Sequence, residues 1–208
     1  STLATSDSVC LLFVCTHNAR RSQLAQAWGA AIAALTGVER VWVRSAGTEV
    51  SHVDPRTLDA LHRAGLREGG LREVDATRTG ERHGGDNPRY SLTFGPYTRP
   101  VGLWSKSLDD SCPPGATTVA VMTCSEADAA CPVVPGAAAR VSLPYQDPGR
   151  ANGSAEESAV YDEVCGQIAT ELLAVFTTLA GGDRDGGAAA ELNKGIKQSR
   201  SNRLLEPA

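Results

Sequence analysis

Apolar residues occur along the chain in two patterns, short continuous runs and stripes with helical spacing. The first run extends from Val9 to Val14, which is typical of a strand buried on both faces. A stripe with steps of four, four and three residues follows within residues 22–36, and Gly37 ends it, so this pattern predicts an amphipathic helix. Its members are Leu24, Trp28, Ile32 and Leu35.

The alternation of strand and helix continues further along the chain. Asp54 and Pro55 supply an N-cap and a first-turn proline for a second helix, which Gly65 ends. The last helix has the clearest stripe, and Ser154 with Glu157 predicts a capping box before it. Further strands are predicted at residues 41–43, 117–122 and about 138–143. The stripe of the last helix consists of Val160, Val164, Ile168, Leu172, Val175 and Leu179.

Between residues 67 and 116 this regular alternation is interrupted by scattered glycine, proline and charged residues. A weaker two-residue alternation predicts an inserted hairpin or long loop, with the insertion at about 67–102. We expect residues 181–208, which are rich in glycine and polar residues, to form a flexible C-terminal tail. The remaining pattern predicts a single domain over residues 8–180. The alternating positions of the insertion are Tyr90, Leu92, Phe94, Val101 and Leu103.

Strands that are separated by helices predict an α/β fold with a parallel sheet. We expect three layers, with a four-stranded parallel sheet in the middle and helices on both faces, plus the inserted hairpin or loop. In open sheets of this kind, ligands bind at the carboxyl ends of the strands. Cys15 follows the first strand directly and is therefore expected at this edge.

Composition and charge disfavour several classes of function. The 208 residues carry a net charge of −4, so we expect no nucleic-acid partner. We see neither a leader-like N-terminus nor an apolar window of about 18 residues, and expect a cytoplasmic protein with no membrane partner. Six cysteines in such a chain are more often catalytic, metal-binding or buried than disulfide-bonded. Without a Cys-x-x-Cys pair, we expect no metal site.

The segment between the first strand and the first helix has the features of an anion-binding loop. Its backbone must curl around the helix N-terminus, where free N–H groups and the helix dipole attract a tetrahedral oxyanion. Arg21 can add a bidentate guanidinium, and the same field favours the nucleophilic thiolate of Cys15. Ser22 can donate to that thiolate, and Asn18 can hold the loop. The expected oxyanion-binding residues are Thr16, His17, Asn18, Ala19, Arg20, Arg21 and Ser22.

A simpler alternative is a buried cysteine before an ordinary turn, because cysteine is among the most buried residue types. The stretch CTHNARRSQLAQAW, which starts at Cys15, favours function. It resembles the anion loop and first helix of the low-molecular-weight protein tyrosine phosphatases and of the arsenate reductases built on the same fold. The resemblance implies a small four-stranded parallel sheet with helices on both sides, and a thiolate that attacks a tetrahedral oxyanion.

Both branches of this family need a proton for the departing oxygen. The Asp147-Pro148 pair matches the position and type of the family's acid loop, so the resemblance implies that Asp147 is the general acid. Asp-Pro is also common in turns without catalytic function.

The stretch VMTCSEADAACPVVPG resembles the redox segment of the thioredoxin-coupled arsenate reductases, where two cysteines separated by six residues lie between a strand and a turn. Carried over, Cys124 is the first resolving thiol, and Cys131 carries the disulfide outward to thioredoxin, the electron donor. Taken singly, each of these cysteines is better explained as a buried small residue, but their joint spacing next to the loop match reverses this preference. Cys10 and Cys165 are expected to be packing residues, and Cys112 is given no role.

Two departures from the family pattern bear on function. The acidic residues that help to bind potassium in the thioredoxin-coupled branch are replaced here by Gln26 and Ser107, which argues against a potassium site. Gly149 stands where the phosphatases carry an aromatic residue beside the phosphotyrosine ring, which disfavours the phosphatase alternative.

The favoured hypothesis is a thioredoxin-recycled arsenate reductase of arsenic detoxification, without a bound cofactor. A phosphatase acting on aryl phosphates and a redox-responsive oxyanion-binding protein are the alternatives. The residues expected to carry the reaction are Cys15, Arg21, Cys124, Cys131 and Asp147.

Overall fold

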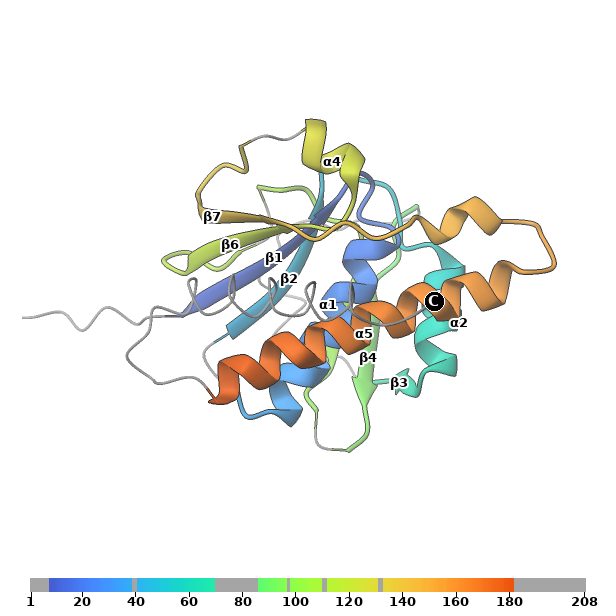
Figure 1. Ribbon diagram of the computed structural model, residues 1–208, viewed down its shortest axis with the longest axis horizontal. Coiled ribbons are helices and arrows are strands. Elements are labelled where there is room, and N and C mark those ends of the chain that lie inside the picture. The colour runs from blue at the N-terminus through green and yellow to red at the C-terminus, as the bar shows by residue number, and fades with distance from the viewer. Residues whose placement is uncertain are drawn as a thin grey trace, which may run out of the picture.

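The computed structural model describes residues 8–38, 41–69, 86–96, 98–109, 112–130 and 133–181. At its centre lies a four-stranded sheet in the order β2-β1-β6-β7, in which neighbouring strands pair in parallel (Figure 1). The strands are β1 (Val9–Cys15), β2 (Val41–Gly47), β6 (Thr117–Met122) and β7 (Ala137–Ser142). The predicted α/β fold with four parallel strands is confirmed.

Alternate residues of β1 face opposite sides of the sheet and join different apolar clusters. Leu11 and Phe13 lie in the larger core, together with residues of α1 (Arg21–Leu35), α2 (Pro55–Arg63) and α5 (Glu157–Gly181). Leu12 and Val14 lie in a smaller cluster with Ala127 of the short helix α4 (Ser125–Ala130). Among the described elements, three helices therefore serve one face and a single short helix serves the other.

The local sequence explains where the helices begin. Asp54 caps α2, because its carboxylate accepts a hydrogen bond from a first-turn N–H at 3.0 Å. Before α5, Ser154 Oγ accepts from the N–H of Glu156 at 3.2 Å, and the carboxylate of Glu157 accepts from the N–H of Gly153 at 2.6 Å. The two predicted capping residues are thus used, but each binds a backbone group one position away from the expected one.

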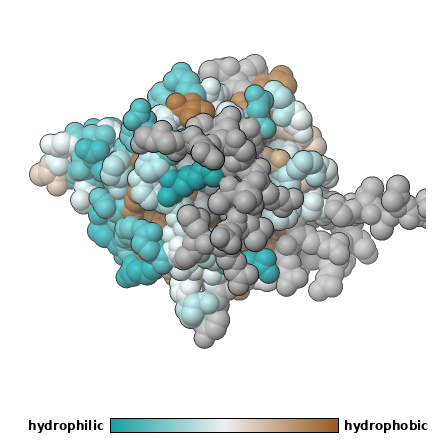
Figure 2. Space-filling model, turned by 180° about the vertical axis from the view of Figure 1, so that it is seen from behind, coloured by the Kyte–Doolittle hydropathy of each residue, from teal (hydrophilic) through white to brown (hydrophobic). Residues whose placement is uncertain are grey.

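Helix α5 is the one helix of the described chain that is long and apolar enough to cross a membrane, judged by length and composition alone. One side of it lies in the larger core, where Tyr161, Ile168 and Phe176 are completely buried. Figure 2 shows one face of the molecule, on which the coloured hydrophilic and hydrophobic residues are interspersed.

The inserted segment forms a second sheet, which is antiparallel and has the order β3-β4-β5. Its strands are β3 (Leu66–Glu68), β4 (Tyr90–Phe94) and β5 (Val101–Leu103). The predicted hairpin is confirmed as β4 and β5, and β3 is an additional strand. Leu92 and Leu103 are completely buried in the larger core, and the ring centroid of Phe94 lies 5.4 Å from that of Trp28 in α1. The small sheet therefore packs against α1.

Parts of several predictions lie outside the described residues. They are residues 70–85 and 97 of the expected insertion, residues 182–208 of the expected tail, and Cys131.

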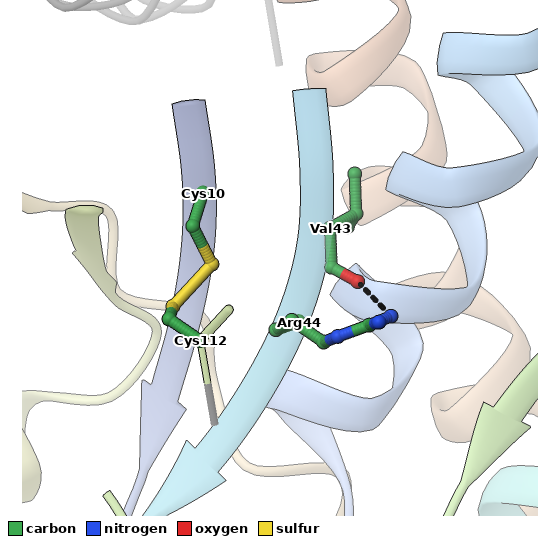
Figure 3. The surroundings of a disulfide bond; sticks show 4 residues. All are labelled: Cys10, Val43, Arg44 and Cys112. Carbon is green, nitrogen blue, oxygen red and sulfur yellow. Dashed lines mark hydrogen bonds between the residues drawn. A yellow bond between two sulfur atoms is a disulfide. The ribbon is translucent and has the colours of Figure 1, made fainter. Parts of the chain in front are cut away.

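One cysteine pair departs from the expectation that cysteines in such a chain are catalytic, metal-binding or buried rather than disulfide-bonded. Cys10 and Cys112, which are 102 positions apart, form a disulfide with their Cα atoms 6.2 Å from each other (Figure 3). Cys10 is thus more than a packing residue. It lies on the same side of β1 as Leu12, and the segment after β5 brings Cys112 to the apolar cluster on that side. Spacing in the sequence does not reveal the pair, because only the crossing of this segment over the sheet brings the two residues together.

We expect the Cys10→Ala/Cys112→Ala variant to be less stable than the wild type. A disulfide typically contributes about 2–4 kcal/mol, which corresponds to a Tm about 4–16 °C higher for a domain of this size. Thermal unfolding followed by circular dichroism measures the difference, with Cys165→Ala as a buried cysteine outside the pair. An unchanged Tm in the double variant, or recovery of both residues as free thiols in peptide mapping, contradicts the expectation.

Candidate active site

A cavity of about 260 Å³ lies beside the carboxyl end of β1. It is lined by the loop between β1 and α1, by the first turn of α4, and by the residue that caps the short 3-10 helix η1 (Pro148–Ala151). The lining residues are Cys15, Thr16, His17, Ala19, Arg20, Arg21, Glu126 and Asp147. Asn18 and Ser22, which the sequence places in the same oxyanion loop, are completely buried and do not line the cavity. The structure thus brings Cys15, Arg21 and Asp147 together around one space.

Behind the cavity, a chain of hydrogen bonds ends at the sulfur of Cys15. The side-chain amide of Asn18 donates to Ser22 Oγ at 2.7 Å, and Ser22 Oγ lies 3.0 Å from Cys15 Sγ. Because Ser22 Oγ accepts from Asn18, its own hydrogen is available to the sulfur. A donor at this position suits a thiolate, which is the nucleophilic form of cysteine.

Asn18 also fixes the shape of the loop. Its φ of 47° lies in the left-handed region, which asparagine adopts more readily than most residues. Its Oδ1 accepts hydrogen bonds from the N–H of Lys106 at 2.8 Å and from Gln23 Nε2 at 3.0 Å. Ser105 Oγ donates to the carbonyl of His17 at 2.9 Å. The segment that follows β5 therefore holds the loop from its outer side.

Arg21 stands at the end of the loop with a donor left over. It is 7% exposed, and its Nη groups donate to the carbonyl of Tyr145 at 3.3 Å and to Asp147 Oδ2 at 3.0 Å. Its Nε is buried and has no hydrogen-bond partner among the described residues. No side chain of the described residues caps the N-terminus of α1, which begins at Arg21. A helix N-terminus with a spare guanidinium donor is a suitable site for an oxyanion.

Asp147 is held by two arginines. Arg20 binds it as a fork, with Nε 2.8 Å from Oδ1 and Nη2 2.9 Å from Oδ2, while Arg21 adds a third bond. The N–H of Gly149 donates to Oδ1 at 2.9 Å. Burial favours the neutral acid, but the hydrogen bonds from Arg20 and Gly149 and the nearby positive charges outweigh it, so the pKa of Asp147 is lowered from its usual value. In this arrangement Asp147 is a carboxylate rather than a proton donor.

Cys124 follows β6 and is completely buried beside the loop. Its Sγ lies 3.7 Å from Thr16 Oγ1 and accepts a hydrogen bond from the N–H of Ala127 at 3.3 Å. Cys15 and Cys124 belong to the same apolar cluster. Burial raises the pKa of the Cys124 thiol, so its resting form at neutral pH is protonated. Cys165 is also buried, but in the larger core, where it accepts a hydrogen bond from Trp28 Nε1 at 3.2 Å.

Gln26 and Ser107, which replace the acidic residues that help to bind potassium in the thioredoxin-coupled branch, do not fit a potassium ion. The side-chain amide of Gln26 donates to one protein group and its oxygen accepts from another. Ser107 forms an isolated parallel bridge with Gly47 of β2. The neighbouring Lys106 is buried, and its Nζ donates to the carbonyl of Trp104 at 2.8 Å. Burial lowers the pKa of Lys106, and two nearby guanidiniums lower it further. This donor set offers no carboxylate to a cation.

Sequence patterns do not reveal two contributors to the site. Glu126 lines the cavity, with its carboxylate 3.5 Å from Nη1 of Arg21, and its only sequence signal is its position just after Cys124. Gly47 ends β2 directly beside the loop. Its sequence signal is that a small residue stands at the end of a predicted strand. His17, in contrast, is half-exposed and pairs with Glu49 at 3.1 Å, as befits a residue on the rim of the cavity.

Comparison with known proteins points to the same loop. The fold and the site define an α/β protein in which a cysteine and an arginine flank the loop between β1 and α1. The sequence model of the family described as low molecular weight phosphotyrosine protein phosphatase matches residues 10–79, which include this loop. No curated protein sequence matches the chain. The family match ends before Cys124 and Asp147, so their roles depend on the geometry.

Solved structures of similar fold come from both branches of this family. An arsenate reductase from Archaeoglobus fulgidus DSM 4304 is 19% identical, with a TM-score of 0.49, over 83% of this chain and 99% of that chain. A thioredoxin-dependent arsenate reductase from Corynebacterium glutamicum is 21% identical, with a TM-score of 0.38, over 81% and 61%. A low molecular weight protein tyrosine phosphatase from T. tengcongensis is 16% identical, with a TM-score of 0.46, over 80% and 95%. These likenesses do not distinguish a reductase from a phosphatase.

Proposed function

We propose that the protein is an enzyme of the low-molecular-weight phosphatase superfamily that reduces arsenate to arsenite, with thioredoxin as the electron donor. The observation that carries the proposal is the second buried thiol, Cys124, beside the loop of Cys15. Hydrolysis of a phosphate ester needs one thiolate, whereas reduction of arsenic(V) needs two electrons and hence a second thiol. The family match over residues 10–79 supports the oxyanion chemistry of the loop.

In the first step, the thiolate of Cys15 attacks arsenic in the monoanion H₂AsO₄⁻. A sulfur–arsenic bond forms, an arsenic–oxygen bond breaks, and the oxygen leaves as water, so that Cys15–S⁻ and H₂AsO₄⁻ become Cys15–S–AsO₃²⁻ and H₂O. Arg21 and the loop amides stabilise the charge on the arsenate oxygens. Asp147 transfers the proton to the departing oxygen. The oxidation state of arsenic is unchanged in this step.

In the second step, Cys124 attacks the sulfur of Cys15 as a thiolate, and the proton of its resting thiol goes to the departing arsenite. A disulfide forms, the sulfur–arsenic bond breaks, and its electron pair leaves with arsenic as arsenite, so two thiols supply the two electrons. Cys131 then attacks Cys124 and releases Cys15, which leaves a Cys124–Cys131 disulfide. The dithiol of thioredoxin reduces this disulfide, and the relay requires no bound cofactor.

Arsenate-dependent oxidation of NADPH in the presence of thioredoxin and thioredoxin reductase tests the proposal. We expect turnover in the wild type and none in Cys15→Ser, Cys124→Ser or Cys131→Ser, whereas Cys165→Ala serves as the control for loss of a buried cysteine remote from the cavity. Mass mapping of the protein after arsenate treatment should show a Cys124–Cys131 disulfide. Full reductase activity in both Cys124→Ser and Cys131→Ser would exclude the relay.

A phosphatase acting on aryl phosphates is the second candidate, and the family match favours it. Hydrolysis of p-nitrophenyl phosphate that survives Cys124→Ser, with no arsenate reduction in the wild type, would support it. A redox-responsive oxyanion-binding protein would instead bind arsenate or phosphate without turning either over.

A further inference from the structure

The hydrogen bonds of Asp147 conflict with its proposed task. A general acid must carry a proton, but both oxygens of this carboxylate accept hydrogen bonds from positively charged groups or from the backbone. Such donors stabilise the ionised form. Of these groups, Arg20 makes the largest contribution, because it alone binds both oxygens. The free protein therefore holds its acid in the form that cannot react.

We propose that Arg20 is a positioning residue that clamps Asp147 as a carboxylate in the free protein and releases it when an oxyanion enters the cavity. We call the fork between the two side chains the Arg20–Asp147 clamp. Oxygens of the bound anion then accept the hydrogen bonds that Arg20 and Arg21 donate to Asp147 in the free protein. Once freed, Asp147 takes a proton from the bound monoanion and returns it to the departing oxygen, so no other reactant is needed. This inference rests on the proposed function, since it describes how its acid becomes active.

The position of Arg20 allows this exchange. Arg20 and Asp147 both line the cavity, and their side chains are 24% and 29% exposed. Arg20 also donates through Nη1 to Asp54 Oδ2 at 3.3 Å. Asp54 is fixed, because it caps α2 and accepts a hydrogen bond from the hydroxyl of Tyr161 at 3.2 Å. Arg20 therefore keeps one anionic partner when it leaves Asp147.

Gly149 makes room for the clamp. A Cβ built on Gly149 would lie 3.0 Å from Cζ and 3.2 Å from Nε of Arg20. A larger residue there requires the guanidinium to shift by a few tenths of an ångström, so the arginine in the loop and the glycine after Asp147-Pro148 are coupled. Together they place a guanidinium at the wall of the cavity, which favours a small inorganic oxyanion over a substrate with an aromatic ring.

The charged groups that face Asp147 come from several elements. All of these groups affect the titration of Asp147, whereas Arg20→Gln and Gly149→Ala alter only the contribution of Arg20. They are Arg20 and Arg21 at the start of α1, Glu126 in α4, His17 on the rim of the cavity, and Asp54 through Arg20.

Titration of the Asp147 side-chain carboxyl by ¹³C NMR tests the clamp without any turnover, with the signal assigned by Asp147→Asn. In the wild type, saturating inorganic phosphate should raise the pKa of Asp147, because the clamp opens. In Arg20→Gln the pKa should already be raised in the free protein, and phosphate should change it little. Gly149→Ala should have a smaller effect of the same sign, since the charge remains but the fork lengthens. Arg63→Gln, which removes an arginine that pairs with Asp162 away from the cavity, is the matched control.

Kinetics supply a second readout. In Arg20→Gln, the basic limb of the pH profile of kcat/KM should stay where it is in the wild type, because the substrate monoanion and not the free enzyme brings the proton; a basic limb that moved to higher pH would contradict this proton route. Phosphate should also protect Cys15 from iodoacetamide about tenfold less well, through loss of one charged donor. Identical titration of Asp147 in wild type and Arg20→Gln would overturn the clamp even if arsenate is reduced. A clamp that opens in a protein without reductase activity would instead overturn the proposed function alone.

Discussion

The Gly47→Ala variant is expected to lose about a hundredfold in turnover, because displacing a reacting group by about 1 Å has an effect of this size. A Cβ on Gly47 would lie 2.5 Å from the carbonyl oxygen of Glu49, 2.6 Å from that of Thr16, and 2.8 Å from the amide nitrogen of Asn18. All three are backbone atoms, so rotating a side chain cannot relieve the conflict. The loop between β1 and α1 must move instead.

Stability should fall together with activity in this variant. Overpacking of this kind costs about 1–3 kcal/mol, which lowers the Tm of a domain of this size by roughly 2–12 °C. Gly166→Ala is the matched control, because Gly166 is exposed in α5 with no atom within 4 Å of an added Cβ. There the same change should stabilise the protein by about 0.5–1 kcal/mol. Wild-type turnover and normal phosphate protection of Cys15 in Gly47→Ala would show that the loop is not held in this way.

The Asn18→Asp variant is expected to lose about ten- to a hundredfold in the rate of attack by Cys15, the value of one hydrogen bond to a charged group. The new carboxylate still accepts from the N–H of Lys106 and from Gln23, so the loop keeps its outer contacts. It cannot donate to Ser22, however, whose hydrogen then turns from the sulfur toward the carboxylate. The added negative charge also disfavours a thiolate nearby.

The rate of alkylation of Cys15 by iodoacetamide at neutral pH measures this effect directly. Ser22→Ala removes the same donor from the sulfur, so it should cause a similar loss. Adding Asn18→Asp to Ser22→Ala should then cost little more, because the two residues act through one chain of hydrogen bonds. Fully multiplicative losses would show that Asn18 and Ser22 act independently.

Most elements of the central fold follow from the apolar pattern of the chain. The run from Val9 to Val14 and the stripe from Leu24 to Leu35 correspond to β1 and α1, and residues 117–122 correspond to β6 as predicted. These elements can be predicted because their apolar residues follow one another or recur with the spacing of a helix. The loop before α1 could be interpreted for the same reason, since its position between a strand and a helix follows from its neighbours.

Contacts between distant segments could not be predicted in this way. The Cys10–Cys112 disulfide depends on a segment without periodicity that crosses the sheet. The bond from the N–H of Lys106 to Asn18 uses the backbone, which leaves no mark in the sequence. The charge of Arg20 is visible in the sequence, but its bond to Asp147, and the close approach of its guanidinium to Gly149, are not. Gly149 and Arg20 are far apart in the sequence, and only the folded structure brings them together.

The short path from the small sheet to the oxyanion loop has a practical consequence. Leu103 is buried at the end of β5, and the next residues along the chain, from Trp104 to Lys106, already hold Gln23, His17 and Asn18. We therefore expect local melting of the small sheet to disturb the loop after Cys15 before the central sheet unfolds. In a heating experiment, enzyme assays should register damage earlier than far-ultraviolet spectroscopy, and a plateau between the two curves would mark the small sheet as a separate cooperative unit.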